Sequence, residues 1–281
     1  MYNQIKELLQ EQAEQSKSAA LVHEQLRESD AYKEELQFLR KTTIDFTNTL
    51  RLCQFAASRW VDFHEKYLLP QHFDDLAEAA LTAQLAIENG ALNPARRELR
   101  YMLEVAVNIA YVDEEMSKAS LLERRDFYKS KQVKKINVDQ VSKLPFRLLE
   151  EHKESFAQYT KNAWVRSSNY VHLTKRQMDQ KLELREKGIT LGMETVEMLK
   201  EVVSEVHEVC SIVSIIIFET IGPSFTGDIF VDNLDSHDHW TLHANGYIAL
   251  VDSYFDYKHE RKDRLDLIRE TRASRIKYPV A

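Results

Sequence analysis

The chain has 281 residues, of which 43% are hydrophobic and 30% are charged, and its formal net charge is −7. This composition suits a soluble globular protein with a sizeable core, and the charge argues against a protein that coats nucleic acid over its whole surface. Six glycines and five prolines are too few for a turn-rich all-β fold, so the sequence favours long helices.

Targeting and redox signals are sparse. Two cysteines, Cys53 and Cys210, cannot build a disulfide scaffold or a cysteine-based zinc site, and they suit a reducing cytosol. The N-terminus is polar and lacks the apolar segment of a signal peptide. The longest apolar run, 212–218, is much shorter than the roughly 20 residues of a membrane-spanning helix. We therefore expect a cytoplasmic protein without a membrane partner.

The N-terminal part, residues 1–70, is predicted to be a helical extension. Residues 2–50 contain no Gly or Pro, and Ser29-Asp30 could divide them into two helices by capping the second. Their apolar stripe is thin, so this helical pair needs to pack on the rest of the chain or on a second copy of it. A further helix is expected from Leu52 to near Pro70.

The central part, residues 71–220, is predicted to be a helical domain. One helix is expected from Phe73 to the stop signal at Asn89-Gly90, and the next opens at Asn93-Pro94 and runs to about residue 121. Residues 121–147 are loop-rich, with eight basic against three acidic side chains.

Two further helices complete this central domain. The first passes through Trp164 to His172. The second, over 191–220, has a wide apolar stripe that predicts a central place in the core, and Gly222-Pro223 is expected to stop it.

The C-terminal part, residues 221–281, is predicted to be a small appendage. Asn245-Gly246 lies between two apolar-rich runs, which is the pattern of a β-hairpin with a type I′ turn. A basic helix is expected after this hairpin.

The segment Trp164-Val-Arg166-Ser-Ser168-Asn169-Tyr-Val-His172 pairs an arginine with a histidine six positions later. By spacing alone it is an amphipathic helix end with a capping histidine and a solvated arginine. On an ideal helix the two side chains lie about 120° apart. They can converge on one phosphate if it lies across the helix end, or if His172 follows the last turn.

This segment resembles the Arg-x(4–6)-His signature of the HEPN superfamily, an all-α fold with many metal-independent ribonucleases. The tail Ser-Asn-Tyr-Val-His is similar to the Ser-x-Tyr-x-His pattern of abortive-infection-like bacterial HEPN families. Arg97-Glu-Leu-Arg100-Tyr-Met-Leu-Glu104 resembles an earlier helix of those families. The resemblance covers about residues 73–220 and implies an all-α, HEPN-like helical bundle.

The same resemblance implies a metal-independent endoribonuclease of a bacterial defence or toxin system that needs no cofactor. His172 would be the general acid or base on a ribose 2′-hydroxyl or a leaving 5′-oxygen, since an ordinary histidine pKa of about 6.5 suits proton transfer at neutral pH. Arg166 would hold the scissile phosphate bidentately. Ser168 and Asn169 are candidates for orienting the His172 ring, and the supporting candidates on the earlier helix are Arg100 and Glu104.

The implied partners are RNA, a second copy in a homodimer, and a regulatory protein such as an antitoxin or a defence-system ATPase. Charge distribution agrees with RNA as a partner. Residues 161–187 carry seven basic against three acidic side chains, and together with 121–147 they flank the Arg166–His172 segment.

A second cluster lies in residues 232–243. In an extended chain His237 and His239 point the same way, so they are candidate zinc ligands together with Asp235 or His243. The alternative is an acidic loop, because ligands this close in sequence rarely complete a coordination shell.

Three functions therefore stay open at the level of sequence. The first is the metal-independent ribonuclease. The second is a non-catalytic HEPN-like module that binds a protein or a nucleotide. The third is a metal-dependent hydrolase that uses the histidine cluster.

Overall fold

The computed structural model describes residues 2–60, 62, 65, 67–132, 138–170, 178, 179, 182, 192–237 and 239–280. The α-helices are α1 (Tyr2–Arg27), α2 (Asp30–Ala57), α4 (Phe73–Glu88), α5 (Leu92–Glu115), α6 (Leu121–Gln132), α7 (Lys153–Ser168), α9 (Val196–Asp228), α10 (Gly246–Ser253) and α11 (Leu265–Arg275). Shorter helical turns are η1 (Leu69–His72), η2 (Val138–Lys143), η3 (Arg147–His152), η4 (Ile229–Leu234), η5 (Thr241–Ala244) and η6 (His259–Arg264). Within these described ranges no β-strand occurs, which confirms the all-α class.

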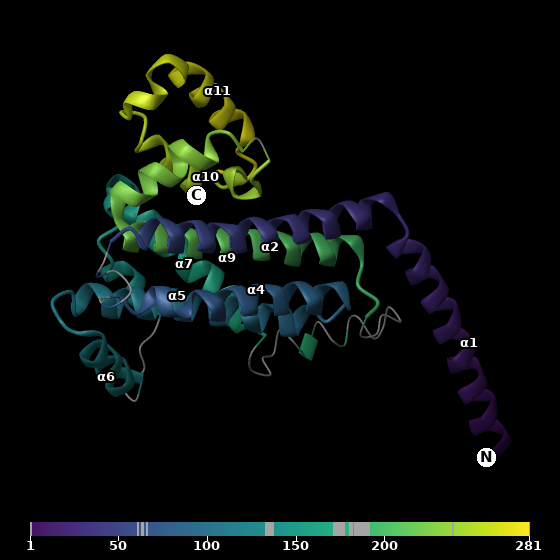
Figure 1. Cartoon of the computed structure of the whole chain (residues 1–281). Coiled ribbons are helices and arrows are strands. Elements are labelled where there is room, and N and C mark those ends of the chain that lie inside the picture. The colour runs from purple at the N-terminus through teal and green to yellow at the C-terminus, as the bar shows by residue number, and fades with distance from the viewer. Residues whose placement is uncertain are drawn as a thin grey trace.

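The N-terminal helices divide where the sequence indicates. The Ser29 hydroxyl accepts a hydrogen bond from the Tyr32 backbone N–H at 3.4 Å, so Ser29 is the N-cap of α2. α1 projects away from the bundle, whereas α2 runs along it (Figure 1). The expected new helix at Leu52 is wrong: α2 continues to Ala57, because its buried face is unbroken through this region.

The core is built from two helix pairs. α2 lies along α9, and α4 lies along α5 as the adjacent layer, with α7 packed on α5 (Figure 1). One continuous set of buried side chains extends from Tyr32 on α2 through Leu99 on α5 and Phe218 on α9 to Phe255 beyond α10. The core therefore includes helices on both sides of residues 70 and 220, where the sequence suggested domain boundaries.

α9 contributes more buried residues than any other described helix, and it does not end where the sequence predicts. Gly222 adopts φ +85° and ψ 167°, a backbone conformation that favours glycine, and Pro223 follows it. The helix resumes at once and reaches Asp228. Gly222-Pro223 is therefore a kink within α9, because the apolar residues after it still have core to fill.

The expected β-hairpin at Asn245-Gly246 is wrong. The Asn245 side-chain oxygen accepts hydrogen bonds from the backbone N–H groups of Tyr247 at 2.9 Å and Ile248 at 3.4 Å, so Asn245 is the N-cap of α10. A short apolar run fits a buried helix as well as a strand. Here most of α10 is buried, and the backbone N–H of Gly246 donates to the Tyr278 carbonyl at 2.8 Å.

Candidate functional site

Arg166 lies in the last turn of α7, and its side chain is 43% exposed. Its Nη2 donates to the Glu208 carboxylate on α9, and no other acceptor in the described part of the chain contacts its guanidinium. Burial opposes the charge on Arg166, but the hydrogen bond and charge of Glu208 raise its pKa above the ordinary arginine value. The guanidinium is thus fixed at one nitrogen, and its remaining N–H groups, which no described residue binds, could bind an anion.

Glu208 is itself largely enclosed. Burial raises the pKa of Glu208, although the hydrogen bond from Arg166 works in the opposite direction. Burial and the nearby Glu208 charge also raise the pKa of the Tyr159 hydroxyl. The Asn245 side-chain nitrogen donates to that hydroxyl at 3.1 Å. A polar chain therefore links α7 and α9 to the N-cap of α10.

The chain that leaves α7 is held on α5 by Tyr170, which is 4% exposed. The Arg96 guanidinium lies over the Tyr170 ring, and Arg97 Nε donates to the Tyr170 carbonyl at 3.1 Å. Arg96 Nε also donates to a carboxylate oxygen of Glu205, at 2.6 Å. The backbone is thus anchored two residues before His172.

His172, the expected proton-transfer residue, lies outside the described residues. α7 ends at Ser168 rather than at His172, with Asn169 as its C-cap. The Ser168 hydroxyl donates to the Trp164 carbonyl at 2.6 Å, so its proton is used within its own helix. The sequence expectation that Ser168 and Asn169 orient the His172 ring stays a prediction.

The two supporting residues expected on the earlier helix do lie together. Arg100 Nε donates to Glu104 Oε1 at 2.8 Å, and Trp164 Nε1 donates to the same oxygen at 3.0 Å. The Arg100 guanidinium lies over the Trp164 indole, 5.0 Å from its centroid. Together these contacts fix α7 on α5 at Trp164, two residues before Arg166.

Sequence reasoning missed Glu205 and Glu208, which bind Arg96 and Arg166 from successive turns of α9. A signal was present, because both acids interrupt the long apolar stripe of that helix. A carboxylate on a buried helix needs a cationic or hydrogen-bonding partner. The partners came from α5 and α7, which the spacing within α9 does not reveal.

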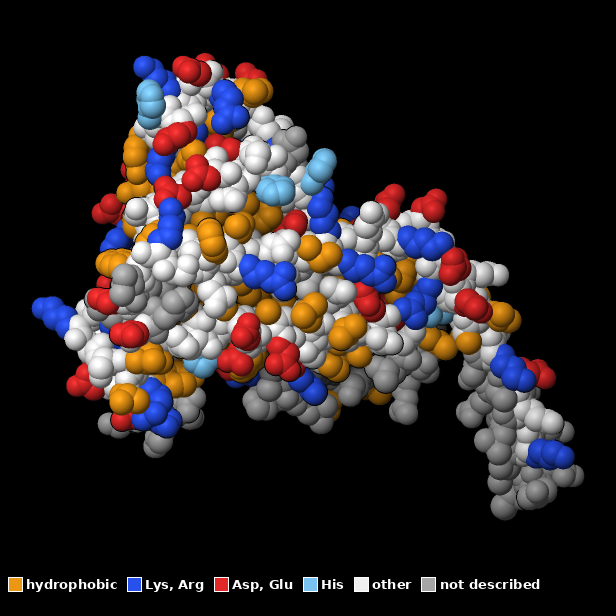
Figure 2. All heavy atoms as spheres, viewed as in Figure 1, with side chains coloured by type: hydrophobic (Ala, Val, Ile, Leu, Met, Phe, Trp, Pro, Cys, Tyr) orange, Lys and Arg blue, Asp and Glu red, His pale blue; other side chains and the backbone are white. Residues whose placement is uncertain are grey.

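Several basic residues of the expected phosphate-attracting segments are already paired. Arg124 is buried against Asp113 at 2.9 Å, and Arg147 contacts Glu114 at 3.1 Å. On the face seen in Figure 2, Lys and Arg side chains are intermixed with Asp and Glu. The basic character of 121–147 is therefore partly neutralised by the fold.

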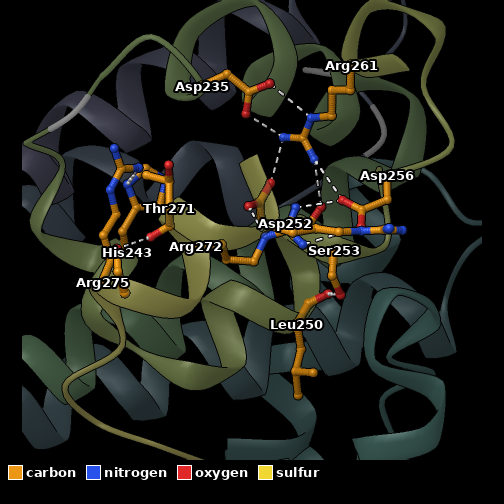
Figure 3. Close-up of polar contacts among 12 residues, drawn as sticks. Asp235, His243, Leu250, Asp252, Ser253, Asp256, Arg261, Thr271, Arg272 and Arg275 are labelled. Atoms are coloured by element: carbon orange, nitrogen blue, oxygen red, sulfur yellow. Dashed lines mark hydrogen bonds and ion pairs between the residues drawn. The ribbon is translucent and has the colours of Figure 1, made fainter. Parts of the chain in front are cut away.

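The candidate zinc ligands do not gather at one point. Asp235 accepts hydrogen bonds from Arg261 at 2.9 and 2.6 Å, whereas His243 Nδ1 accepts from Arg275 at 3.2 Å (Figure 3). Among the described residues, no three His, Cys, Asp or Glu side chains are arranged to hold a metal. Arg261 thus binds both carboxylate oxygens of Asp235, and Arg275 occupies the Nδ1 lone pair of His243.

One described helical stretch, Val196–Leu234, is long and apolar enough to cross a membrane by length and composition. In its most apolar window 72% of the residues are buried inside the protein, as in the core helix of a bundle.

Comparison of the chain with protein-family models, with curated proteins and with solved structures gives no match.

Proposed function

We propose that the chain is a HEPN-like endoribonuclease that cleaves RNA without a metal, in a bacterial defence or toxin system. The supporting observation is the Arg166 guanidinium, which is 43% exposed and which Glu208 fixes at one nitrogen, while no other described residue accepts from its remaining N–H groups. A planar guanidinium in this state can bind two phosphate oxygens. Tyr170, two positions before His172 in the sequence, is anchored on α5 next to this helix end.

In the proposed reaction the ribose 2′-oxygen attacks phosphorus and the bond from phosphorus to the 5′-oxygen breaks. One base takes the 2′-hydroxyl proton, one acid protonates the leaving 5′-oxygen, and the product is a 2′,3′-cyclic phosphate. His172 serves as one of these two groups. Arg166 stabilises the negative charge that grows on the phosphate oxygens.

A homodimer completes this proposal. A single His172 cannot be base and acid at the same moment, and a second copy supplies the other histidine. RNA is the substrate, the cytoplasm is the location, and an antitoxin or a defence-system ATPase is the proposed regulator. Light scattering of the purified protein tests the dimer, which a monomer at micromolar concentration would contradict.

The decisive experiment is a cleavage time course on a mixed-sequence RNA with EDTA present. We expect His172→Ala and Arg166→Ala each to lower the rate by about 10²- to 10⁴-fold. Arg166→Lys should restore little activity, because an ammonium lacks the two-pronged guanidinium geometry. Arg147→Ala, which removes another exposed ion-paired arginine, is the matched control and should cleave like wild type.

Circular dichroism shows whether each variant is folded. If folded Arg166→Ala and His172→Ala proteins cleave like wild type, or if EDTA abolishes cleavage, the proposal is wrong.

A second candidate is a non-catalytic HEPN-like module. The Arg166–Glu208 pair favours it, because an ion pair inside a polar chain that joins α7, α9 and α10 can serve stability alone. In that case wild type does not cleave RNA, and Arg166→Ala lowers the melting temperature much more than Arg147→Ala does.

A further inference from the structure

A pocket of about 220 Å³ lies between α2 and the chain that follows η4. One wall consists of Lys41, Asp45 and Asn48, which recur on one face of α2. The opposite wall includes His237, His239 and Trp240. Figure 2 shows histidine side chains beside basic ones at the notch between α2 and the C-terminal part.

The pocket walls are fixed by bonds between α2 and η5. Trp240 Nε1 donates to Thr49 Oγ1 at 3.1 Å. Asp45 Oδ2 accepts from both the backbone N–H and the hydroxyl of Thr241, at 2.6 and 2.8 Å. The one carboxylate among the described lining residues is thus bound to the wall, so its charge is partly compensated.

Four other polar side chains of the pocket can donate hydrogen bonds into it. The side chains of Lys41, Asn48, His237 and His239 make no hydrogen bond or ion pair with any other described side chain or backbone group. An ammonium, an amide and two imidazoles offer at least one N–H each. N–H donors that converge on one pocket suit the oxygens of a phosphate group.

We propose that this pocket binds a small phosphate-bearing ligand. Lys41, His237 and His239 hold the phosphate oxygens, and Trp240 with its apolar neighbours faces the organic part. The histidines that the sequence suggested as zinc ligands thus act as anion donors. This proposal does not depend on ribonuclease activity.

Isothermal titration calorimetry at constant ionic strength tests the site with three probes: inorganic phosphate, adenosine 5′-monophosphate and adenosine. We expect the monophosphate or inorganic phosphate to bind and adenosine to bind at least tenfold more weakly than the better of the two. Tighter binding of the monophosphate identifies a phosphomonoester as the ligand, and tighter binding of inorganic phosphate identifies the free ion. Equal affinity for adenosine and its monophosphate would overturn the proposal. So would the absence of binding by both phosphates at about 10 mM, since a weaker affinity corresponds to a binding free energy of less than about 3 kcal/mol.

Variants locate the site. Lys41→Met and His237→Gln should each raise the Kd at least tenfold, and Lys41→Arg should retain most of the affinity. Lys33→Met, on the same helix but paired with Glu28, and His259→Gln, at another exposed position, are the matched controls. Unchanged binding in Lys41→Met and His237→Gln proteins with normal melting temperatures would place the ligand elsewhere and refute the proposal.

Discussion

The guanidinium of Arg96 on α5 lies over the ring of Tyr170, with its Cζ atom 4.3 Å from the ring centroid. The same guanidinium is paired with Glu205 of α9 through Nε at 2.6 Å. One buried arginine therefore ties two helices to the segment that carries the proposed catalytic histidine.

We expect Arg96→Ala to lower the free energy of unfolding by about 3–5 kcal/mol, because the enclosed Glu205 carboxylate loses its partner. Arg100→Ala is the control: its pair with Glu104 is partly exposed and should contribute about 1 kcal/mol or less. Urea denaturation of both variants measures the difference. If both variants lose a similar free energy of unfolding, the burial of the Arg96 ion pair does not add to stability.

Burial raises the pKa of Glu219 to about 7, although its carboxylate accepts a hydrogen bond from the Leu148 N–H at 2.8 Å. The unfolded value is near 4.5, so this group stabilises the fold below pH 4.5 and the contribution is lost as the pH rises through 7. Glu219→Gln stays neutral at every pH. We expect its stability relative to wild type to rise by up to about 3 kcal/mol between these pH values and then to level off. A difference that does not vary with pH would contradict this expectation.

Burial lowers the pKa of His243 to about 4, and the charge of Arg275 lowers it further. Because the folded pKa lies below the unfolded value of 6.5, neutral His243 contributes stability above pH 6.5 that is lost as the pH falls through 4. We expect His243→Gln to reduce the loss of stability on acidification, measured by urea unfolding between pH 7 and 4. His259→Gln, at an exposed position, is the control variant. Some slope should remain in both, since burial also lowers the pKa of His207 to about 4.

Alanine substitutions at two glycines with positive φ can distinguish the cost of backbone strain from the cost of steric crowding. A Cβ at Gly222 (φ +85°) meets no atom within 4 Å, whereas a Cβ at Gly90 (φ +71°) would lie 2.4 Å from a Glu194 oxygen and 2.6 Å from the Gly192 Cα. We expect Gly222→Ala to cost about 1–2 kcal/mol for its backbone alone. Gly90→Ala should cost more, and thermal unfolding that ranks the two in the opposite order would refute this assignment.

Much of the fold could be predicted because its signals are local. Ser29 caps α2 with its own hydroxyl, and the helix from Phe73 ends where Asn89-Gly90 indicates. Asn245-Gly246 misled because the same asparagine oxygen that suits a turn also caps a helix. A helix forms here rather than a hairpin turn because α10 is buried against residues that are distant in the sequence, and the local sequence does not reveal those contacts.

The candidate site was predictable to a lesser degree. The sequence identified Arg166, and it also paired Arg100 with Glu104 at the spacing of one helical turn. Glu208 is 42 positions from Arg166, so their contact depends on how α7 packs against α9. Contacts of that kind depend on tertiary structure and have no characteristic spacing in the sequence.

The most extensive helix pairing, between α2 and α9, has a consequence for protein synthesis. α2 ends at Ala57, and the ribosome must add all of 58–195 before the first turn of α9 exists. During that interval the apolar face of α2, with Phe46, Leu50 and Cys53, lacks its main cover, and apolar surface exposed in this way is what chaperones generally bind. Closing so long a loop also slows folding relative to bundles whose neighbouring helices pair in order.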